Sequence, residues 1–174
     1  MTAARRGARP KPWASRTARA ILARQHEGFG MDGNTGGTAL TQKHRELIEA
    51  ARAATAQAYA RYSGFRVGAA LLSEQGNVYT GCNVENVSYP VGVCAERNAI
   101  GAAVRAEGPG LRVAAVAVVA FNRRDEPSAC SPCGECRQAI REFSGSAEVI
   151  YMGREGDMTV RTIAELLPDA FGSG

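Results

Sequence analysis

Histidine is scarce in this sequence, because His26 and His44 are the only two among its 174 residues. Neither lies in a metal-binding motif, so a metal site would have to use other ligands. We expect His44 to lie on a helix surface rather than in a catalytic site. Long apolar runs are also lacking, since none reaches the ~18 residues of a membrane-spanning helix. The sequence therefore predicts no association with a membrane.

The cysteine content argues against a disulfide framework. The five cysteines are an odd number, and no secretory signal precedes them. These features indicate a reducing compartment, which we take to be the cytoplasm. Cys82 is expected to be a small buried apolar side chain. The sequence suggests no role for Cys130.

Acidic residues are absent from the first 26 positions, which hold seven basic side chains. The rest of the chain carries 14 basic and 17 acidic residues, so the net charge of +4 comes from the amino-terminal segment. A body without a basic excess is not expected to bind nucleic acid. Residues 28–37 include five glycines, a composition typical of a flexible linker.

The composition therefore predicts two parts. Residues 1–38 are expected to form a basic, glycine-rich disordered tail outside the fold. A targeting segment and sequence upstream of the true start are the alternatives for that tail. Residues 39–174 are expected to form one catalytic domain.

Three of the cysteines and one glutamate form a pattern typical of a hydrolytic zinc site. Glu96 follows Cys94 by two positions, and Pro132 precedes a Cys-x-x-Cys pair, Cys133 and Cys136. Zinc accepts thiolate ligands, and three protein ligands leave a fourth tetrahedral position for water. Glu96 is then the carboxylate, not itself a ligand, that moves protons. The alternatives are a closed four-cysteine site, which usually has two Cys-x-x-Cys pairs, and a redox pair, which leaves Glu96 unexplained.

Arg97 is a candidate for adjusting the charge of this site. Three thiolates on Zn²⁺ leave a net charge of −1, which opposes ionisation of water at the metal. Arg97 directly follows Glu96. We expect its guanidinium to donate to a ligand sulfur and so withdraw charge from the metal. The alternative is a surface arginine at a helix start, where its charge would oppose the helix dipole.

Apolar periodicity and turn residues predict an α/β fold of three layers, α/β/α, with a mixed five-stranded sheet between helices on both faces. A helix is expected from Thr41 to about Tyr62 and ends at Gly64. Other helices are expected at 95–106, 132–143 and 162–165, and strands at 65–72, 78–82, 113–121, 147–152 and 158–161. Cys94 and Cys133 then lie at the starts of two helices, where free backbone N–H groups favour thiolates.

The order of these motifs resembles the cytidine deaminases of the small, homotetrameric, zinc-dependent type. The likeness covers about residues 41–172. The matching segments are 58–72 (AYARYSGFRVGAALL), 81–86 (GCNVEN), 94–97 (CAER), 131–138 (SPCGECRQ) and 165–172 (ELLPDAFG). Together they are far more specific than the cysteine pattern alone.

This resemblance implies an enzyme of pyrimidine salvage. The reaction would be hydrolytic deamination of cytidine and 2′-deoxycytidine to uridine and 2′-deoxyuridine, with release of ammonia. One zinc ion per subunit would be bound by Cys94, Cys133 and Cys136. Hydroxide formed at the metal would attack C4 of the base, while Glu96 carries protons from the water to N3 and to the leaving amine.

The resemblance also implies contacts with the rest of the nucleoside. The backbone N–H of Ala95 would meet the base carbonyl, and Phe65 would pack against the base. Asn83 and Glu85 would bind the ribose 3′-hydroxyl, and Phe171 would reach into a neighbouring subunit of a homotetramer. Simpler roles for these residues are a core aromatic, a turn former, a solvated charge and a loose terminal hydrophobe.

Three other functions remain open. A polynucleotide cytosine deaminase would need a basic groove and aromatic stacking platforms. A nucleoside-antibiotic deaminase would be expected to depart from the Asn83–Asn86 motif, and a zinc-dependent binding module would not need Glu96. A nucleotide substrate is not favoured, because Glu85 brings negative charge and no phosphate-binding glycine loop is present.

Overall fold

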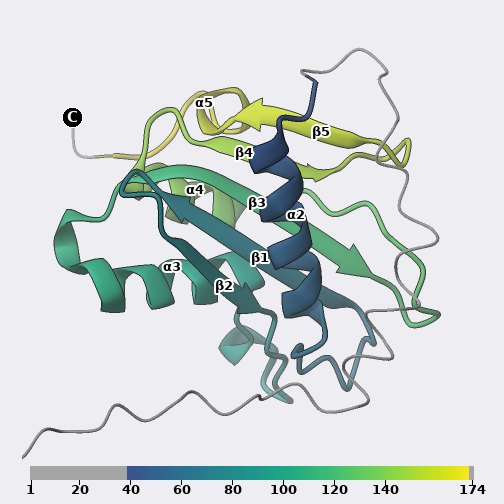
Figure 1. Ribbon diagram of the computed structural model, residues 1–174. Helices are drawn as coiled ribbons and strands as arrows, with labels where there is room; N and C mark the ends of the chain where they lie inside the picture. Colours follow the sequence, from purple (N-terminus) through teal and green to yellow (C-terminus); the bar gives the residue numbers. More distant parts are fainter. Residues whose placement is uncertain (1–38, 173–174) are drawn as a thin grey trace, which may run out of the picture.

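The chain folds around a five-stranded sheet in the computed structural model, which describes residues 39–172. The strands lie in the order β2-β1-β3-β4-β5 (Figure 1). Their bounds are Arg66–Ser73 (β1), Val78–Cys82 (β2), Val113–Phe121 (β3), Glu148–Met152 (β4) and Met158–Thr162 (β5). Only β3 and β4 are parallel neighbours, and the other pairs are antiparallel. The prediction of a mixed five-stranded sheet is confirmed, whereas the predicted tail at 1–38 lies outside the described residues.

Helices cover both faces of this sheet. Figure 1 shows α2 crossing one face, while α3 and α4 lie on the other. The helices are Gln42–Thr55 (α2), Ala95–Glu107 (α3), Gly134–Phe143 (α4) and Ile163–Leu166 (α5), with 3-10 turns at Tyr89–Val91 (η2) and Gly108–Gly110 (η3). The three-layer α/β/α prediction is confirmed. Within the described range, no helix is long and apolar enough to cross a membrane.

The central strand β3 is buried on both sides, as its continuous apolar run predicts. Val116, Val118 and Ala120 belong to the core formed with α3 and α4. Ala117 and Val119 point the other way, into the core formed with α2. Because β3 is fixed from both faces, it provides a rigid base for the helices whose first turns carry the cysteines.

Helix α2 is shorter than the sequence predicts, because it ends at Thr55 rather than near Tyr62. The following backbone pairs with the segment after β2. The Tyr59 N–H donates to the carbonyl of Asn83 at 3.0 Å, and the Glu85 N–H donates to the carbonyl of Tyr59 at 2.8 Å. These long-range bonds satisfy backbone groups that a longer helix would have paired internally. Tyr59 and Tyr62, the large apolar residues of this segment, are 48% and 39% exposed, so the apolar periodicity after Thr55 does not mark a buried helical face.

The expectation that His44 lies on a helix surface is wrong, since its exposed fraction is 5%. Its Nε2 lies 3.0 Å from Oε2 of Glu148 in β4, and its backbone N–H donates to the Thr41 hydroxyl at 3.1 Å. A buried polar ring needs such partners. His44 thus ties the capped start of α2 to the sheet.

Strand β2 lies so close to the start of α3 that the chain needs glycine at position 81. A Cβ added to Gly81 would lie 2.4 Å from the carbonyl oxygen of Ala95 and 2.4 Å from the backbone nitrogen of Ala99. Both atoms belong to the helix backbone, so the start of α3 would have to move. Gly81 therefore sets the position of the helix turn that carries Glu96.

We expect Gly81→Ala to lower the free energy of unfolding by about 1–3 kcal/mol through overpacking. The metal content of the purified protein should fall with it. Gly101→Ala is the matched control, because its added Cβ in the same helix meets nothing within 4 Å. That change should raise stability by about 0.5–1 kcal/mol. Urea unfolding followed by circular dichroism measures both, and an unchanged midpoint for Gly81→Ala would contradict the contact.

Candidate metal centre

Two helix starts bring three cysteine sulfurs together. Cys94 occupies the N-cap position of α3, and Cys133 occupies that of α4. Cys136 follows in the first turn of α4 and is fully buried. The three sulfur atoms all lie within 4.8 Å of one another. The structure thus brings the three predicted zinc ligands together, at the positive ends of two helix dipoles.

The electrostatics of the cluster fit a divalent cation. A hydrogen bond from Cys136 lowers the pKa of the Cys94 thiol to about 7, and the same bond raises the pKa of Cys136. Without a metal ion, ionisation of one thiol makes ionisation of the next less favourable, because like charges at this distance repel each other. Three thiolates can coexist only around a cation, and thiolate sulfur is a ligand that zinc accepts readily.

Glu96 lies beside the sulfur cluster but is not part of it. The side chain is in the first turn of α3, and its exposed fraction is 4%. Burial raises the pKa of its carboxyl above the ordinary value, because the charged form is desolvated. A carboxyl with a raised pKa takes up a proton more readily than an ordinary one, which suits a group that must accept a proton and return it.

A cavity of about 540 Å³ opens onto the cluster. Its wall includes Cys94, Cys133 and Glu96. Three predicted substrate contacts also line it, namely Asn83, Glu85 and Ala95. As the first residue of α3, Ala95 has a backbone N–H without an acceptor in its own helix.

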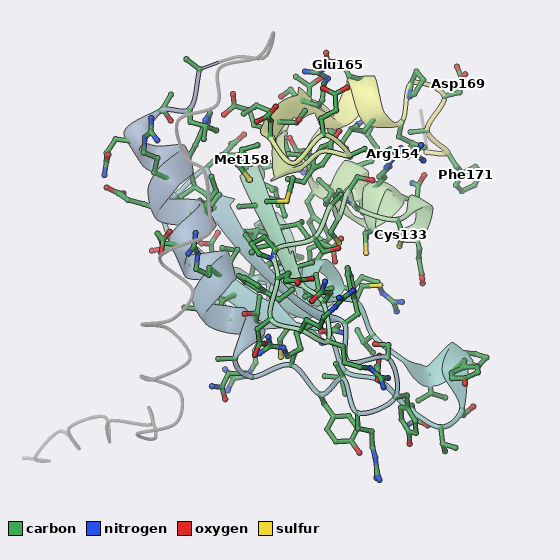
Figure 2. The ribbon with its side chains drawn as sticks, turned by 90° about the vertical axis from the view of Figure 1, so that its right-hand side faces the viewer. Cys133, Arg154, Met158, Glu165, Asp169 and Phe171 are labelled. Atoms are coloured by element: carbon green, nitrogen blue, oxygen red, sulfur yellow. The ribbon has the colours of Figure 1, made fainter. Side chains whose placement is uncertain are left out.

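The two predicted aromatic contacts lie elsewhere. Phe65 does not line the cavity and packs instead against the core beneath α3 and α4. Phe171 is 88% exposed and points away from the body, near the carboxyl end of the described chain (Figure 2). Within one subunit, no aromatic ring from these two positions covers the cavity. Their roles in binding a base stay predictions.

Asn83 and Glu85 both support the wall that they line. Asn83 Oδ1 accepts the backbone N–H of Val67 at 2.8 Å, and its Nδ2 donates to the carbonyl of Phe65 at 2.9 Å. Hydrogen bonds, above all from the Ser63 hydroxyl, lower the pKa of the Glu85 carboxyl. Glu85 is therefore a fixed anion, with a role different from that of Glu96.

Arg97 is engaged by an acidic residue of the second helix. Its Nη1 lies 2.6 Å from Oε1 of Glu135, so the ion pair joins the first turns of α3 and α4. This contact explains a basic residue at a helix start, because Glu135 offsets the unfavourable dipole. Donation to a ligand sulfur stays a prediction.

The sequence did not reveal the support that Arg137 gives to the cysteine loop. Arg137 Nε donates to the carbonyl of Pro132 and its Nη1 to that of Leu166, each at 2.9 Å. The side chain therefore ties the residue before Cys133 to the end of α5. The only sequence signal was its place next to Cys136, inside the cysteine motif.

Cys130 also lines the cavity, three residues before Cys133. Burial and the neighbouring negative charges raise the pKa of its thiol to about 12. Cys130 therefore remains a neutral thiol and does not belong to the sulfur cluster.

An α/β/α fold with three cysteine ligands, a buried carboxyl and an open cavity defines a metal-dependent hydrolase. The family model of the cytidine and deoxycytidylate deaminase zinc-binding region matches residues 41–153. The chain belongs to this deaminase family, and the resemblance seen in the sequence is confirmed. It is therefore an enzyme, and its cysteine cluster fits one zinc ion per subunit.

The similar proteins agree with this assignment. A cytidine deaminase of Sporosarcina psychrophila is 48% identical over 128 residues, which cover 72% of this chain and 89% of that protein. The crystal structure of a cytidine deaminase from Burkholderia pseudomallei has a TM-score of 0.65 at 46% identity, and the match covers 76% of this chain and 100% of that one. A cytidine deaminase structure from Mycobacterium tuberculosis has a TM-score of 0.62 at 40% identity, and covers 74% and 97%.

We expect Cys133→Ser to remove most of the zinc from the purified protein, because the hydroxyl is a poor substitute for a thiolate ligand. Cys133 is exposed, so the change should not by itself disturb the core. Cys130→Ser is the matched control on the same loop and should keep one zinc per chain. Elemental analysis of both variants decides the matter, and equal zinc loss in the two would contradict the assigned ligand set.

Proposed function

We propose that the protein hydrolyses cytidine and 2′-deoxycytidine to uridine and 2′-deoxyuridine, with release of ammonia. The observation that carries this proposal is that the sulfur cluster and the buried Glu96 carboxyl face one cavity. A role in pyrimidine salvage follows from that reaction. The similarity to proteins named cytidine deaminase supports the choice of substrate.

The chemistry can be assigned to the chain's own groups. Zinc, when bound by Cys94, Cys133 and Cys136, supplies a water whose pKa is lowered towards neutrality. Glu96 takes a proton from the attacking water, delivers it to N3 of the base and later protonates the leaving amine. Its raised pKa suits this exchange, because the proton moves in both directions during one turnover.

The remaining cavity residues orient the nucleoside. The free N–H of Ala95 donates to the base carbonyl. Asn83 and Glu85 hold the ribose 3′-hydroxyl, and the bonds that fix Glu85 keep its carboxylate ionised and in place. By the same resemblance Phe65 would contact the base, although its side chain packs against the core in this structure. These assignments follow the resemblance, and their support here is that Asn83, Glu85 and Ala95 share one cavity wall.

The charge of the cavity favours a nucleoside over a nucleotide. Within the described residues, neither lysine nor arginine lines the cavity, while Glu85 and Glu96 do. A phosphate would then meet a carboxylate without a compensating cation. A nucleic-acid strand is disfavoured for the same reason.

The surface near the cavity supports a homotetramer. Val87 and Tyr89 lie on the segment that leads to Cys94, and they are 78% and 82% exposed. Phe171 is exposed as well. Exposed apolar side chains of this size are typical of an interface, and Tyr89 also lines the cavity. In such an assembly Phe171 would complete a neighbouring site. The free cysteines support a reducing compartment, and we propose the cytoplasm.

We expect Glu96→Gln to keep zinc and lower kcat for cytidine by about 10²–10⁴-fold, the usual contribution of a positioned acid–base group. Loss of the cytosine absorbance measures the rate, and zinc is assayed in the same sample. Glu142→Gln, an exposed carboxyl of α4, is the control and should leave kcat unchanged. Zinc-loaded Glu96→Gln with full activity would refute the proton-carrying role.

Arg97 and its partner can be separated by a pair of variants. We expect Arg97→Gln to retain zinc and to lower kcat about tenfold or more, because the metal site loses a nearby positive charge. Glu135→Gln breaks the same ion pair but keeps the guanidinium, so its kcat should stay close to that of the unmodified protein. Equal losses in the two variants would show that joining the helices is the role of Arg97, and not the charge.

A further inference from the structure

The Tyr62–Ser63 turn forms one side of the cavity, and the carboxylate of Glu85 accepts hydrogen bonds from it. Tyr62 and Ser63 line the cavity. Glu85 Oε2 accepts their backbone N–H groups at 2.8 Å and 3.2 Å, and Glu85 Oε1 accepts the Ser63 hydroxyl. The backbone N–H groups of the turn are therefore satisfied by Glu85, the same carboxylate that we propose binds the ribose 3′-hydroxyl.

Arg123 satisfies the acceptors of the same turn from the outside. Its Nε donates to the carbonyl of Ser63 at 3.0 Å, and its Nη2 donates to the carbonyl of Tyr62 at 2.5 Å. The planar guanidinium suits this double donation better than a lysine would. Arg123 does not line the cavity, so it acts on the substrate only through the turn.

Gly64 allows the arginine to come this close. A Cβ added there would lie 2.7 Å from Cγ and 2.8 Å from Nε of Arg123. The backbone of Gly64 also has φ of +69°, a conformation that other residues rarely adopt. The turn and the arginine side chain therefore fit each other at a position where only glycine leaves room.

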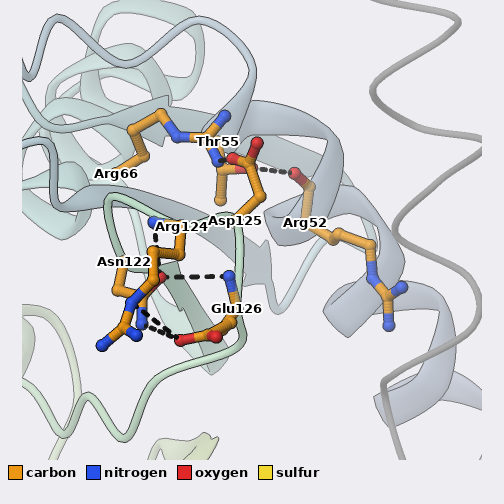
Figure 3. Close-up of polar contacts among 7 residues, drawn as sticks. All are labelled: Arg52, Thr55, Arg66, Asn122, Arg124, Asp125 and Glu126. Carbon is orange, nitrogen blue, oxygen red and sulfur yellow. Dashed lines mark hydrogen bonds and ion pairs between the residues drawn. The ribbon is translucent and has the colours of Figure 1, made fainter.

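The loop that presents this arginine is itself well braced (Figure 3). Asn122 Oδ1 accepts the backbone N–H groups of Arg124 at 2.8 Å and Glu126 at 3.1 Å. Asn122 Nδ2 also donates to the Glu126 carboxylate at 2.7 Å. Asp125 pairs with Arg66 at the start of β1. The loop is thus fixed to the sheet, so that Arg123 can hold the Tyr62–Ser63 turn in place.

We propose that Arg123 is a positioning residue for the sugar end of the substrate. It holds the Tyr62–Ser63 turn against Glu85, so that Glu85 presents its carboxylate to the ribose 3′-hydroxyl. Each carboxylate oxygen accepts about two hydrogen bonds, so Oε1, bound to the Ser63 hydroxyl, has capacity for the sugar. The inference rests on the proposed nucleoside deaminase function and adds a residue that touches neither metal nor substrate.

The test compares Arg123→Ala on two substrates that differ at the sugar. For cytidine, KM should rise about tenfold while kcat stays within about twofold, because the turn is loosened and the metal centre is not. For 2′,3′-dideoxycytidine, which lacks the 3′-hydroxyl, kcat/KM should change less than about twofold. Arg123→Lys, with one carbonyl still within reach, should give an intermediate KM for cytidine.

Arg124→Ala is the matched control from the same loop. Its guanidinium is highly exposed and lies 3.7 Å from Glu126, away from the turn, so both substrates should be processed at the unmodified rate. Zinc content and thermal midpoint are measured for every variant. If the alanine variant proves unfolded, the KM of Arg123→Lys for cytidine decides.

The outcomes separate this inference from the function on which it rests. Zinc-loaded unmodified protein that fails to deaminate cytidine would overturn the proposed function and this inference with it. Normal activity in the unmodified protein, with Arg123→Ala equal to Arg124→Ala, would overturn the inference alone. So would an equal loss on both substrates, because that result indicates a general structural role.

Discussion

The arrangement depends on three thiol groups that would repel one another once ionised. Cys94, Cys133 and Cys136 reach one point because α3 and α4 lie on the same face of the sheet and begin at the same place. Helix dipoles reduce the repulsion but do not remove it, and a cation between the sulfurs does. The surrounding contacts fix the positions of these two helix starts. Gly81 in β2 packs closely against the start of α3, and Arg137 ties Pro132 to the end of α5.

Two carboxyl groups line the cavity, and their surroundings shift their pKa values in opposite directions. Burial raises the pKa of Glu96, whereas hydrogen bonds led by the Ser63 hydroxyl lower the pKa of Glu85. One group is therefore suited to gaining and losing a proton, and the other to staying charged as a fixed acceptor. This division distinguishes the end of the cavity next to the sulfur cluster from the end to which we assign the sugar. It also explains why the positive charge of Arg123 lies on the Glu85 side.

The sequence predicts well the features that depend on local pattern. The structure confirms three such features: the long apolar run of β3, the order of strands and helices, and the convergence of Cys133 and Cys136. It fails where tertiary contacts override a local signal. The segment after Thr55 keeps helical periodicity, yet its backbone pairs with residues near Asn83, and no single-sequence pattern contains that pairing. His44 shows the same limit, because its partner Glu148 is far away in the chain. The predicted role of Phe171 involves a second subunit, and the predicted contact of Phe65 with the base is not seen because Phe65 packs against the core.

The spacing of the cysteines along the chain has a consequence for folding. Residues 94 and 133 enclose all of α3 and β3, so a metal bound to both closes a loop of about 40 residues. By the chain-entropy relation for cross-links, a closure of this length is worth about 4 kcal/mol, comparable to a disulfide. The catalytic ion would then also act as a cross-link between the start of α3 and the start of α4. Unlike a disulfide, this cross-link is not broken by reduction. A chain still emerging from the ribosome cannot form this cross-link until Cys133 has been made, when β4, β5 and α5 of the described fold are still to be added.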